Sequence, residues 1–184
     1  MCADRIQYNI YTGVILNLIS KEDAQNIFDD IKFEDEKWFF TNKELAKKFA
    51  ELSLYFTQNF WGSKWNMSLN IHLANALKRA MELKVITEED LFLTDDIVMQ
   101  TINKNQDHII QLNIQQCKTP LEKIPGKTYK SIFCTPKFRG IDPLVKQEGS
   151  KKIVRLSELD EMFKHYYLTV KEWCKNGFYI NVLS

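Results

Sequence analysis

The feature that most constrains the fold is a run of apolar residues that recur every three or four positions between residues 45 and 60. The run consists of Leu45, Phe49, Leu52, Phe56 and Phe60. This spacing places the side chains on one face of an α-helix, whereas a half-buried strand needs strict alternation. An apolar face of this kind has to be buried against other elements. The run therefore predicts a long amphipathic helix inside a helical domain.

Other segments of the first 117 residues also have helical spacing. Ser20 with Asp23, and Thr41 with Glu44, have the spacing of capping boxes, which begin helices. Together with the apolar spacing, these signals predict helices that begin near residues 4, 20, 41, 67, 94 and 107. The first of them runs from Asp4 to Ile19. Between residues 33 and 40 we expect a connector that is partly extended at 38–40.

The composition changes after Cys117. All 4 prolines lie beyond it, and the turn-forming pairs include Thr119-Pro120 and Pro125-Gly126. Alternating residues at 129–133 predict a strand, and residues 138–145, 152–156 and 178–183 are expected to be extended as well.

Ser157 and Asp160 predict the start of a long final helix, and Gly177 predicts its end. We therefore expect a mainly α fold of the α+β class. It would comprise a helical lobe at 1–117 and a small α+β region at 118–184 that packs on it and is not independent.

Charge and hydropathy exclude several classes of protein. The chain has 25 Lys+Arg against 24 Asp+Glu, which gives no strong signal for nucleic-acid binding through bulk charge. Charged and polar residues interrupt the first 20 positions and every apolar stretch, so neither a signal peptide nor a membrane span is predicted. The 4 cysteines lack metal-binding or C-x-x-C spacing. Reduced thiols in a cytoplasmic protein are the prediction that follows.

The histidines are few and scattered. The chain has 3 of them, His72, His108 and His165, which excludes a local metal motif made of two histidines. His72 has apolar neighbours on its predicted helix, which favours a packing role. No glycine-rich phosphate-binding motif occurs.

Asp4 and Tyr8 form the first candidate site. They are four residues apart and therefore share one face of the predicted helix. A carboxylate and a phenol on one face suit a metal ion and a substrate. The alternative interpretation is structural: Asp4 is favoured by the helix dipole, and Tyr8 packs at the edge of the core.

Lys137 and Arg139 form the second candidate site. Two residues apart on an extended segment, they point the same way and suit a phosphate group. The alternative is an edge strand with a solvated charged face, followed by a turn at Asp142-Pro143. A further basic cluster is interpreted as a solvated rim; it consists of Lys146, Lys151, Lys152 and Arg155.

Residues 2–8 (CADRIQY) resemble a motif of the HD-superfamily metal-dependent phosphohydrolases, in the branch of the deoxynucleoside triphosphate triphosphohydrolases. In that family a helix carries the last metal-ligand Asp, followed four residues later by a Tyr that faces the substrate. The resemblance implies these roles for Asp4 and Tyr8. It continues less specifically at residues 138–145 (FRGIDPLV) and 155–160 (RLSELD). The chain is thus similar to the C-terminal portion of that architecture.

The family also uses a His and a His-Asp pair as metal ligands, and this sequence has no His-Asp dipeptide. An Arg-Asp pair that is common one turn after the Tyr is replaced by Tyr11-Thr12. The resemblance therefore implies a fragment, a split or truncated gene product, or a relative that has lost catalysis. A divalent metal (Mn, Mg, Fe or Ni) is expected only if another segment or partner supplies the missing ligands.

The alternative function is a non-catalytic helical module that binds a protein or a nucleotide. The richness in aromatic residues, among them Phe56, Phe60, Trp61 and Trp65, favours this hypothesis. Self-association is the corresponding expectation if such residues form an exposed surface.

Overall fold

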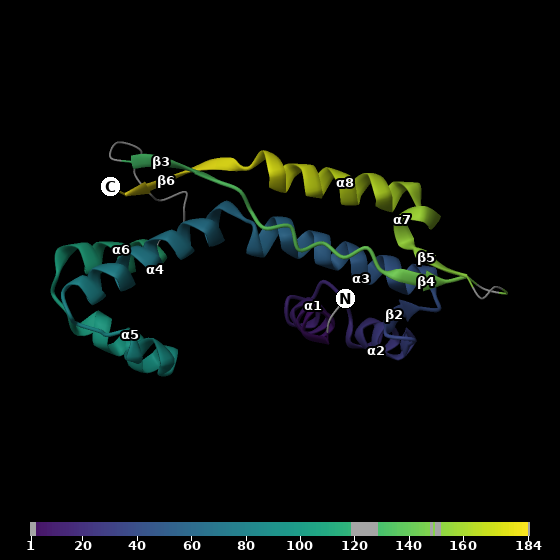
Figure 1. The fold of residues 1–184 in the computed structure, drawn as a ribbon, viewed down its shortest axis with the longest axis horizontal. Helices are drawn as coiled ribbons and strands as arrows, with labels where there is room; N and C mark the ends of the chain where they lie inside the picture. Colours follow the sequence, from purple (N-terminus) through teal and green to yellow (C-terminus); the bar gives the residue numbers. More distant parts are fainter. Residues whose placement is uncertain (1–2, 119–128, 148, 150–151, 184) are drawn as a thin grey trace. The chain divides into compact units, whose positions relative to one another are not determined.

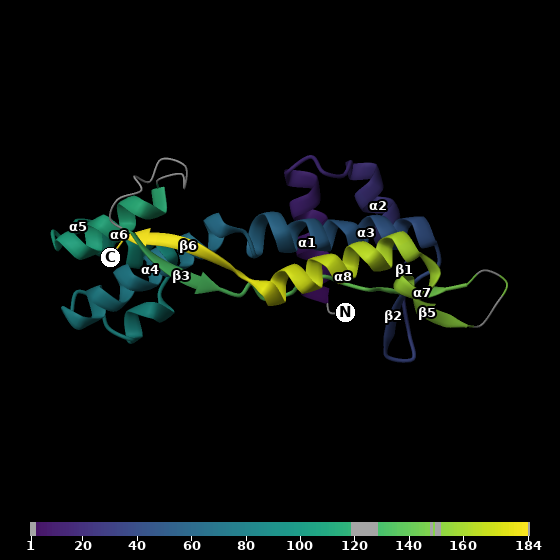
Figure 2. The same cartoon turned by 90° about the horizontal axis from the view of Figure 1, so that it is seen from above.

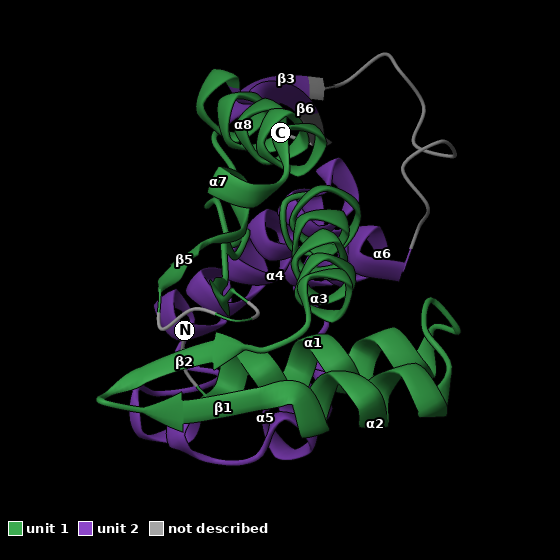
Figure 3. Cartoon of the chain, turned by 90° about the vertical axis from the view of Figure 1, so that its right-hand side faces the viewer, with its two compact units in different colours: residues 1–62, 135–176 green, residues 63–134, 177–184 purple. Residues whose placement is uncertain are grey.

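A computed structural model describes residues 3–118, 129–147, 149 and 152–183. The chain is mainly α with a small β component, which confirms the expected fold class. The contacts divide it into two compact units, Met1–Gly62 with Thr135–Asn176 and Ser63–Cys134 with Gly177–Ser184 (Figure 3). These units interleave along the sequence, unlike the expected division at residue 117. Among the described helices, none is long and apolar enough to reach across a bilayer.

The first unit holds the N-terminal helices and the last helix of the chain. Its helical elements are α1 (Ala3–Ile15), α2 (Lys21–Asp30), α3 (Lys43–Phe56), the π-helical turn η1 (Thr57–Trp61), α7 (Leu156–Leu159) and α8 (Glu161–Asn176). α1 ends four residues before the expected Ile19, and Asn17 in the following turn has a φ of 55°. The Ser20 capping box is confirmed, because the Asp23 amide donates to Ser20 Oγ at 2.9 Å.

The start of α3 differs by one residue from the expectation. Asn42, rather than Thr41, caps the helix, and its Oδ1 accepts bonds from the amides of Glu44 and Leu45 at 2.9 and 3.1 Å. Thr41 is held elsewhere, because its amide and hydroxyl both donate to the Asp30 carboxylate. The contact between Asp30 and Thr41, which lie 11 positions apart, thus shifts the cap from Thr41 to Asn42.

The four-stranded sheet of the first unit begins earlier in the chain than expected. Its strands are β1 (Ile31–Glu34), β2 (Lys37–Phe40), β4 (Leu144–Lys146) and β5 (Ile153–Arg155). The order is β1-β2-β4-β5, with β2 and β4 parallel and the other pairs antiparallel. Asp35 and Glu36 form the β1–β2 turn with φ values of 49° and 60°. The expected connector at 33–40 is therefore mostly a hairpin (Figure 2).

The predicted apolar face of α3 is buried in the core of the first unit. Phe49 and Phe56 are fully buried, and Phe49 packs against Phe40 with ring centroids 5.6 Å apart. Burial of each such side chain contributes on the order of 1.5–3 kcal/mol. α8 runs alongside α3 and adds Phe163 and Val170 to the same core (Figure 1). The apolar run between residues 45 and 60 therefore forms the centre of the first unit.

The final helix α8 begins at Glu161, directly after Asp160, and Ser157 belongs to the separate short helix α7. Asp160 Oδ1 accepts a bond from the Phe163 amide at 2.9 Å. Its other oxygen lies 3.3 Å from Lys43 Nζ and 3.1 Å from Lys47 Nζ. The bond from the Phe163 amide, with those from Lys47 and Lys43, lowers the pKa of Asp160 to about 2. The carboxylate thus ties the start of α8 to α3.

Replacement of Asp160 by Asn tests this tie, because Asn keeps the cap and removes the charge. We expect Asp160→Asn to lower the free energy of unfolding by about 1–2 kcal/mol near neutral pH. The wild-type carboxylate stabilises fully above its ordinary pKa of 3.8, and this contribution is lost as the pH falls towards about 2. The difference in the free energy of unfolding between the wild type and Asp160→Asn should therefore shrink as the pH falls from 3.8 towards about 2. Urea titrations at several pH values measure this difference. The exposed Glu161→Gln is the control, and a pH-independent difference would contradict the assignment.

The second unit contains α4 (Lys64–Glu82), the 3₁₀ turn η2 (Glu89–Phe92), α5 (Asp95–Lys104) and α6 (His108–Lys118). Strands β3 (Tyr129–Cys134) and β6 (Phe178–Leu183) pair in antiparallel fashion. Both strands were predicted, and Gly177 with a φ of 60° ends α8 as expected. The predicted turns at Thr119-Pro120 and Pro125-Gly126 lie outside the described residues, as do Cys2 and Lys151.

His72 is buried between α4 and α6, in agreement with the packing role predicted for it. Its Nδ1 lies 2.8 Å from Oδ1 of Asn113, whose Nδ2 donates to the Ile109 carbonyl at 2.9 Å. Because Asn113 presents an oxygen, Nδ1 is the donor and Nε2 is the acceptor in the neutral ring. Within the described residues Nε2 has no partner. His108 and His165 are exposed.

Candidate functional site

α1 presents the first pair of predicted site residues. Its buried face consists of Ile6, Asn9 and Gly13, and Gly13 lies against α3, where an added Cβ would meet Leu52 Cδ2 at 2.7 Å. Asp4 and Tyr8 lie outside this face, one turn apart. The helical spacing expected for them is present.

Asp4 and Tyr8 have different surroundings. Asp4 is exposed, and no hydrogen bond or ion pair with another described residue engages its carboxylate. Its place in the first turn is favoured by the helix dipole. Tyr8 is half-buried, and its ring meets that of Trp61 edge-on, with centroids 5.1 Å apart. Packing therefore orients the phenol, while the carboxylate is left open.

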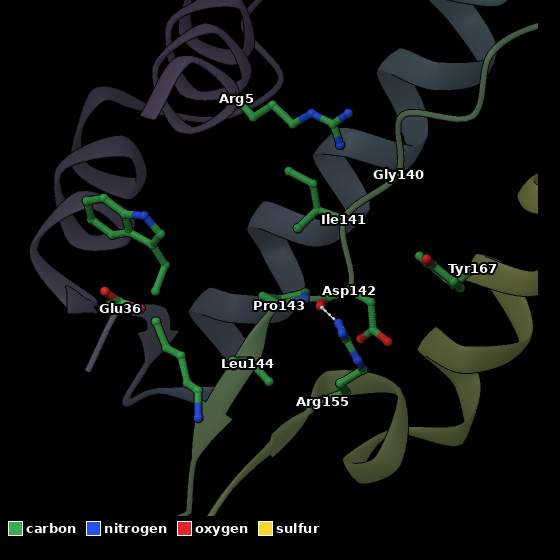
Figure 4. Close-up of a pocket in the computed structure, with 11 residues that line it drawn as sticks. Arg5, Glu36, Gly140, Ile141, Asp142, Pro143, Leu144, Arg155 and Tyr167 are labelled. Atoms are coloured by element: carbon green, nitrogen blue, oxygen red, sulfur yellow. Dashed lines mark hydrogen bonds between the residues drawn. The ribbon is translucent and has the colours of Figure 1, made fainter. Parts of the chain in front are cut away.

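A pocket of about 340 Å³ is lined by Arg5, the residue between Asp4 and Ile6 on α1 (Figure 4). It is formed by α1, the β1–β2 hairpin, the segment before β4, the end of β5 and α8. Its lining combines cations, carboxylates and aromatic rings: Arg5, Glu36, Lys37, Trp38, Gly140, Ile141, Asp142, Pro143, Leu144, Arg155 and Tyr167. The formal charge of these side chains sums to +1.

The wall of the pocket at residues 140–143 is fixed to α3. The Ile141 amide donates to the buried Ser53 Oγ at 2.9 Å, and Ser53 Oγ donates to the Ala50 carbonyl at 2.7 Å. Gly140 approaches so closely that an added Cβ would lie 2.5 Å from Leu54 Cδ2. Only glycine allows this approach without displacement of its neighbours. The wall is therefore held by backbone contacts.

Asp142 and Arg155 are held by the same wall. Both Asp142 carboxylate oxygens accept bonds from Ser157, from its amide at 3.0 Å and its hydroxyl at 2.7 Å. Arg155 Nη1 donates to the Asp142 carbonyl at 3.0 Å, and this bond is drawn in Figure 4. The Asp142 carboxylate is thus engaged in hydrogen bonds that hold the fold. The hydrogen bond from Nη1 orients the Arg155 side chain.

Tyr167 adds a neutral donor to the pocket. Its ring meets Phe138 edge-on at 5.2 Å and lies 5.9 Å from Phe163. Burial raises the pKa of Tyr167, the Asp142 carboxylate raises it further, and Arg155 opposes this effect. The hydroxyl is therefore protonated at neutral pH, and within the described residues it makes no hydrogen bond.

The second predicted pair does not line this pocket. Lys137 is exposed and Arg139 is half-buried. The segment at 135–143 has no regular strand geometry, so the alternation assumed for them does not hold. The cations that line the pocket are Arg5, Lys37 and Arg155. Arg5 is the neighbour of Asp4 in the motif at residues 2–8, and Arg155 belongs to the basic cluster predicted to form a solvated rim. The sequence holds no signal for Lys37.

Asp4 does not by itself fit a catalytic metal ion. Such a site needs several ligands and groups that orient them. Within the ranges that the structure describes, no group of three or more His, Cys, Asp and Glu side chains is placed to hold a metal ion. A metal at Asp4 would therefore require ligands from another polypeptide segment.

The chain is similar to the uncharacterized protein YdhJ of Bacillus subtilis (strain 168). The two are 24% identical over 186 aligned positions, which cover all of this chain and 56% of YdhJ. The chain thus spans little more than half the length of this relative. No protein-family model matches the chain. No solved structure matches it significantly.

Ser53 offers a test of how the pocket wall is held. Ser53→Ala would leave the buried Ile141 amide without its acceptor, so we expect the free energy of unfolding to fall by about 1–3 kcal/mol. Thr169→Ala is the control, because it removes an exposed hydroxyl that bonds its own helix at 2.9 Å. Urea unfolding of both variants measures the effect. A Ser53→Ala protein no less stable than this control would contradict the role given to Ser53.

Proposed function

We propose that this chain is the C-terminal part of an HD-type nucleotide phosphohydrolase and is inactive alone. In this proposal Asp4 supplies the last ligand of a divalent metal site, whose His and His-Asp ligands come from another segment or from a partner chain. Tyr8 would contact the substrate. Lys137 and Arg139 are proposed as further substrate contacts, because they precede the segment that lines the pocket.

The observation that carries the proposal is the presentation of Asp4 and Tyr8 on α1. Asp4 is exposed and unengaged among the described residues, and Tyr8 is oriented by Trp61 one turn along. YdhJ also extends beyond the aligned region, which is where the proposal expects the missing ligands. Cys134 and Cys174 are free thiols, which suits the cytoplasm as the compartment.

The test joins the chain to the segment that carries the missing ligands. A coding segment with a His and a His-Asp pair is sought next to the gene, and both products are assayed together with Mn²⁺ and deoxynucleoside triphosphates. We expect hydrolysis only with both present, and a loss of at least about 100-fold with Asp4→Asn, because a metal ligand is removed. Asp96→Asn, at the corresponding exposed position of α5, is the matched control.

Two results would contradict the proposal. One is full activity of the assembled protein with Asp4→Asn. The other is a complete ligand set that yields no hydrolysis although the two parts bind each other.

An apolar groove favours the second candidate function, a non-catalytic binding module. The groove has a volume of about 610 Å³ and is lined almost wholly by apolar residues of α1, α2 and the hairpin. Tyr11 and Phe28 line it, and each is 63% exposed. Contiguous apolar surface of this kind marks interaction sites.

The module hypothesis predicts association through this groove. Tyr11→Glu and Phe28→Glu should each weaken self-association of the chain at least about tenfold, because a charge would be buried in an apolar contact. Sedimentation velocity over a range of concentrations measures this. Phe92→Glu is the control, since Phe92 is 91% exposed and lies outside the groove. A chain that stays monomeric at every concentration would count against self-association.

A further inference from the structure

A stretch of large apolar side chains lies exposed on the second unit. Phe92 is 91% exposed, and Leu91 and Leu93 on either side of it are 47% and 48% exposed. Ile97, in the first turn of α5, is 48% exposed as well. Single exposed apolar residues are common, but three in succession mark a surface kept for an interaction. We name residues 91–93 and 97 the η2–α5 surface.

The backbone of the η2–α5 surface is held in place. The Asp90 carboxylate accepts bonds from the Thr87 amide at 2.8 Å and from the Thr87 hydroxyl at 3.1 Å. The Leu93 amide donates to the Asp90 carbonyl at 3.0 Å. Ile86 before the turn and Val98 after it are both buried in the core of the second unit. The apolar side chains are therefore presented by an ordered turn, which lowers the entropic cost of binding a partner.

Acidic residues border the η2–α5 surface in the sequence, and no described cation pairs with them. Residues 85–103 contain no Lys, Arg or His, and their acidic residues are Glu88, Glu89, Asp90, Asp95 and Asp96. None of these carboxylates forms an ion pair with another described residue. The surface therefore carries negative charge that the described part of the chain does not neutralise.

This combination of apolar surface and negative charge restricts the chemistry of the partner. A purely apolar partner would cover the carboxylates without supplying counter-charges, which costs free energy. Nucleic acid, an anionic membrane and the same surface of a second copy are all negatively charged, so the carboxylates repel them. A helix with an apolar face bordered by Lys or Arg supplies both the apolar contact and the missing cations.

We propose that the η2–α5 surface binds a basic amphipathic helix of another protein, with Phe92 as the apolar anchor and the neighbouring carboxylates as partners of its cations. Large aromatic side chains supply much of the binding free energy at protein interfaces. The proposal rests neither on the hydrolase hypothesis nor on the apolar groove. The η2–α5 surface belongs to the second unit and contains no residue of α1, α2 or the β1–β2 hairpin.

The experiment uses a designed peptide as the probe. The peptide has about 14 residues, all of them Leu or Lys, with Leu at the spacing of one helical face. One control peptide has Glu in place of Lys, and the other has the same composition in an order that forms no apolar face. Isothermal titration calorimetry of the full chain measures the dissociation constants. We expect the basic amphipathic peptide to bind at least about tenfold more tightly than either control, and we expect added salt to weaken its binding.

A variant of Phe92 tests the apolar contact. Phe92→Ser should raise the dissociation constant of the basic amphipathic peptide at least about fivefold, because the anchor is removed. The side chain is almost fully exposed, so the substitution leaves the fold intact. Leu168→Ser, at a residue of α8 that is 51% exposed, is the matched control.

A double variant tests the charged contact. Glu88→Gln combined with Glu89→Gln should weaken binding at low salt and reduce the dependence of the dissociation constant on salt. Glu161→Gln combined with Glu172→Gln removes the same charge from exposed positions of α8 and is the matched control.

The proposal is overturned if the basic amphipathic peptide does not bind, if either control peptide binds as tightly, or if Phe92→Ser binds as tightly as the wild type. Flotation with phosphatidylcholine vesicles tests the membrane as the alternative partner. Vesicle binding that Phe92→Ser abolishes would also overturn the proposal, because it would assign the surface to a membrane. None of these results bears on the hydrolase hypothesis, whose test depends on Asp4.

Discussion

The contact between α3 and the segment at residues 140–141 is the constraint on which the first unit depends. Gly140 packs against Leu54, and the Ile141 amide is bonded to the buried Ser53 hydroxyl. β4 follows directly and pairs with both β2 and β5. The same segment carries Asp142, which binds the start of α7 through Ser157. A glycine and a serine thus join the sheet, the short helix and the central helix.

The sequence predicted the elements better than the contacts between them. Apolar spacing identified α3, and alternation with turn signals identified β3 and β6, because these patterns are local. The cap of α3 and the β1–β2 hairpin were missed. Thr41 is held by Asp30, and the hairpin pairs with a strand that lies more than 100 residues later, neither of which local spacing reveals.

The residues of the candidate site differ in the same way: local spacing predicts some of them, and only tertiary contacts reveal the others. Asp4 and Tyr8 were found from their helical spacing and from a family resemblance, and the structure places them one turn apart on α1. Arg5, Lys37 and Arg155 line one pocket, one wall of which is the segment at 140–143 held on α3. No spacing rule connects residues 5, 37 and 155. Lys137 and Arg139 fit a spacing rule, but their segment lacks the strand geometry that the rule assumes.

Amide hydrogen exchange at Ile141 tests the central contact most directly. The Ile141 amide belongs to a segment without regular secondary structure, yet its bond to Ser53 Oγ is buried. We predict exchange as slow as that of amides in the middle of α3, such as Phe49, because both require the unit to open. Exchange as fast as at the exposed turn residue Glu36 would show that the wall of the pocket is not held and would contradict the account.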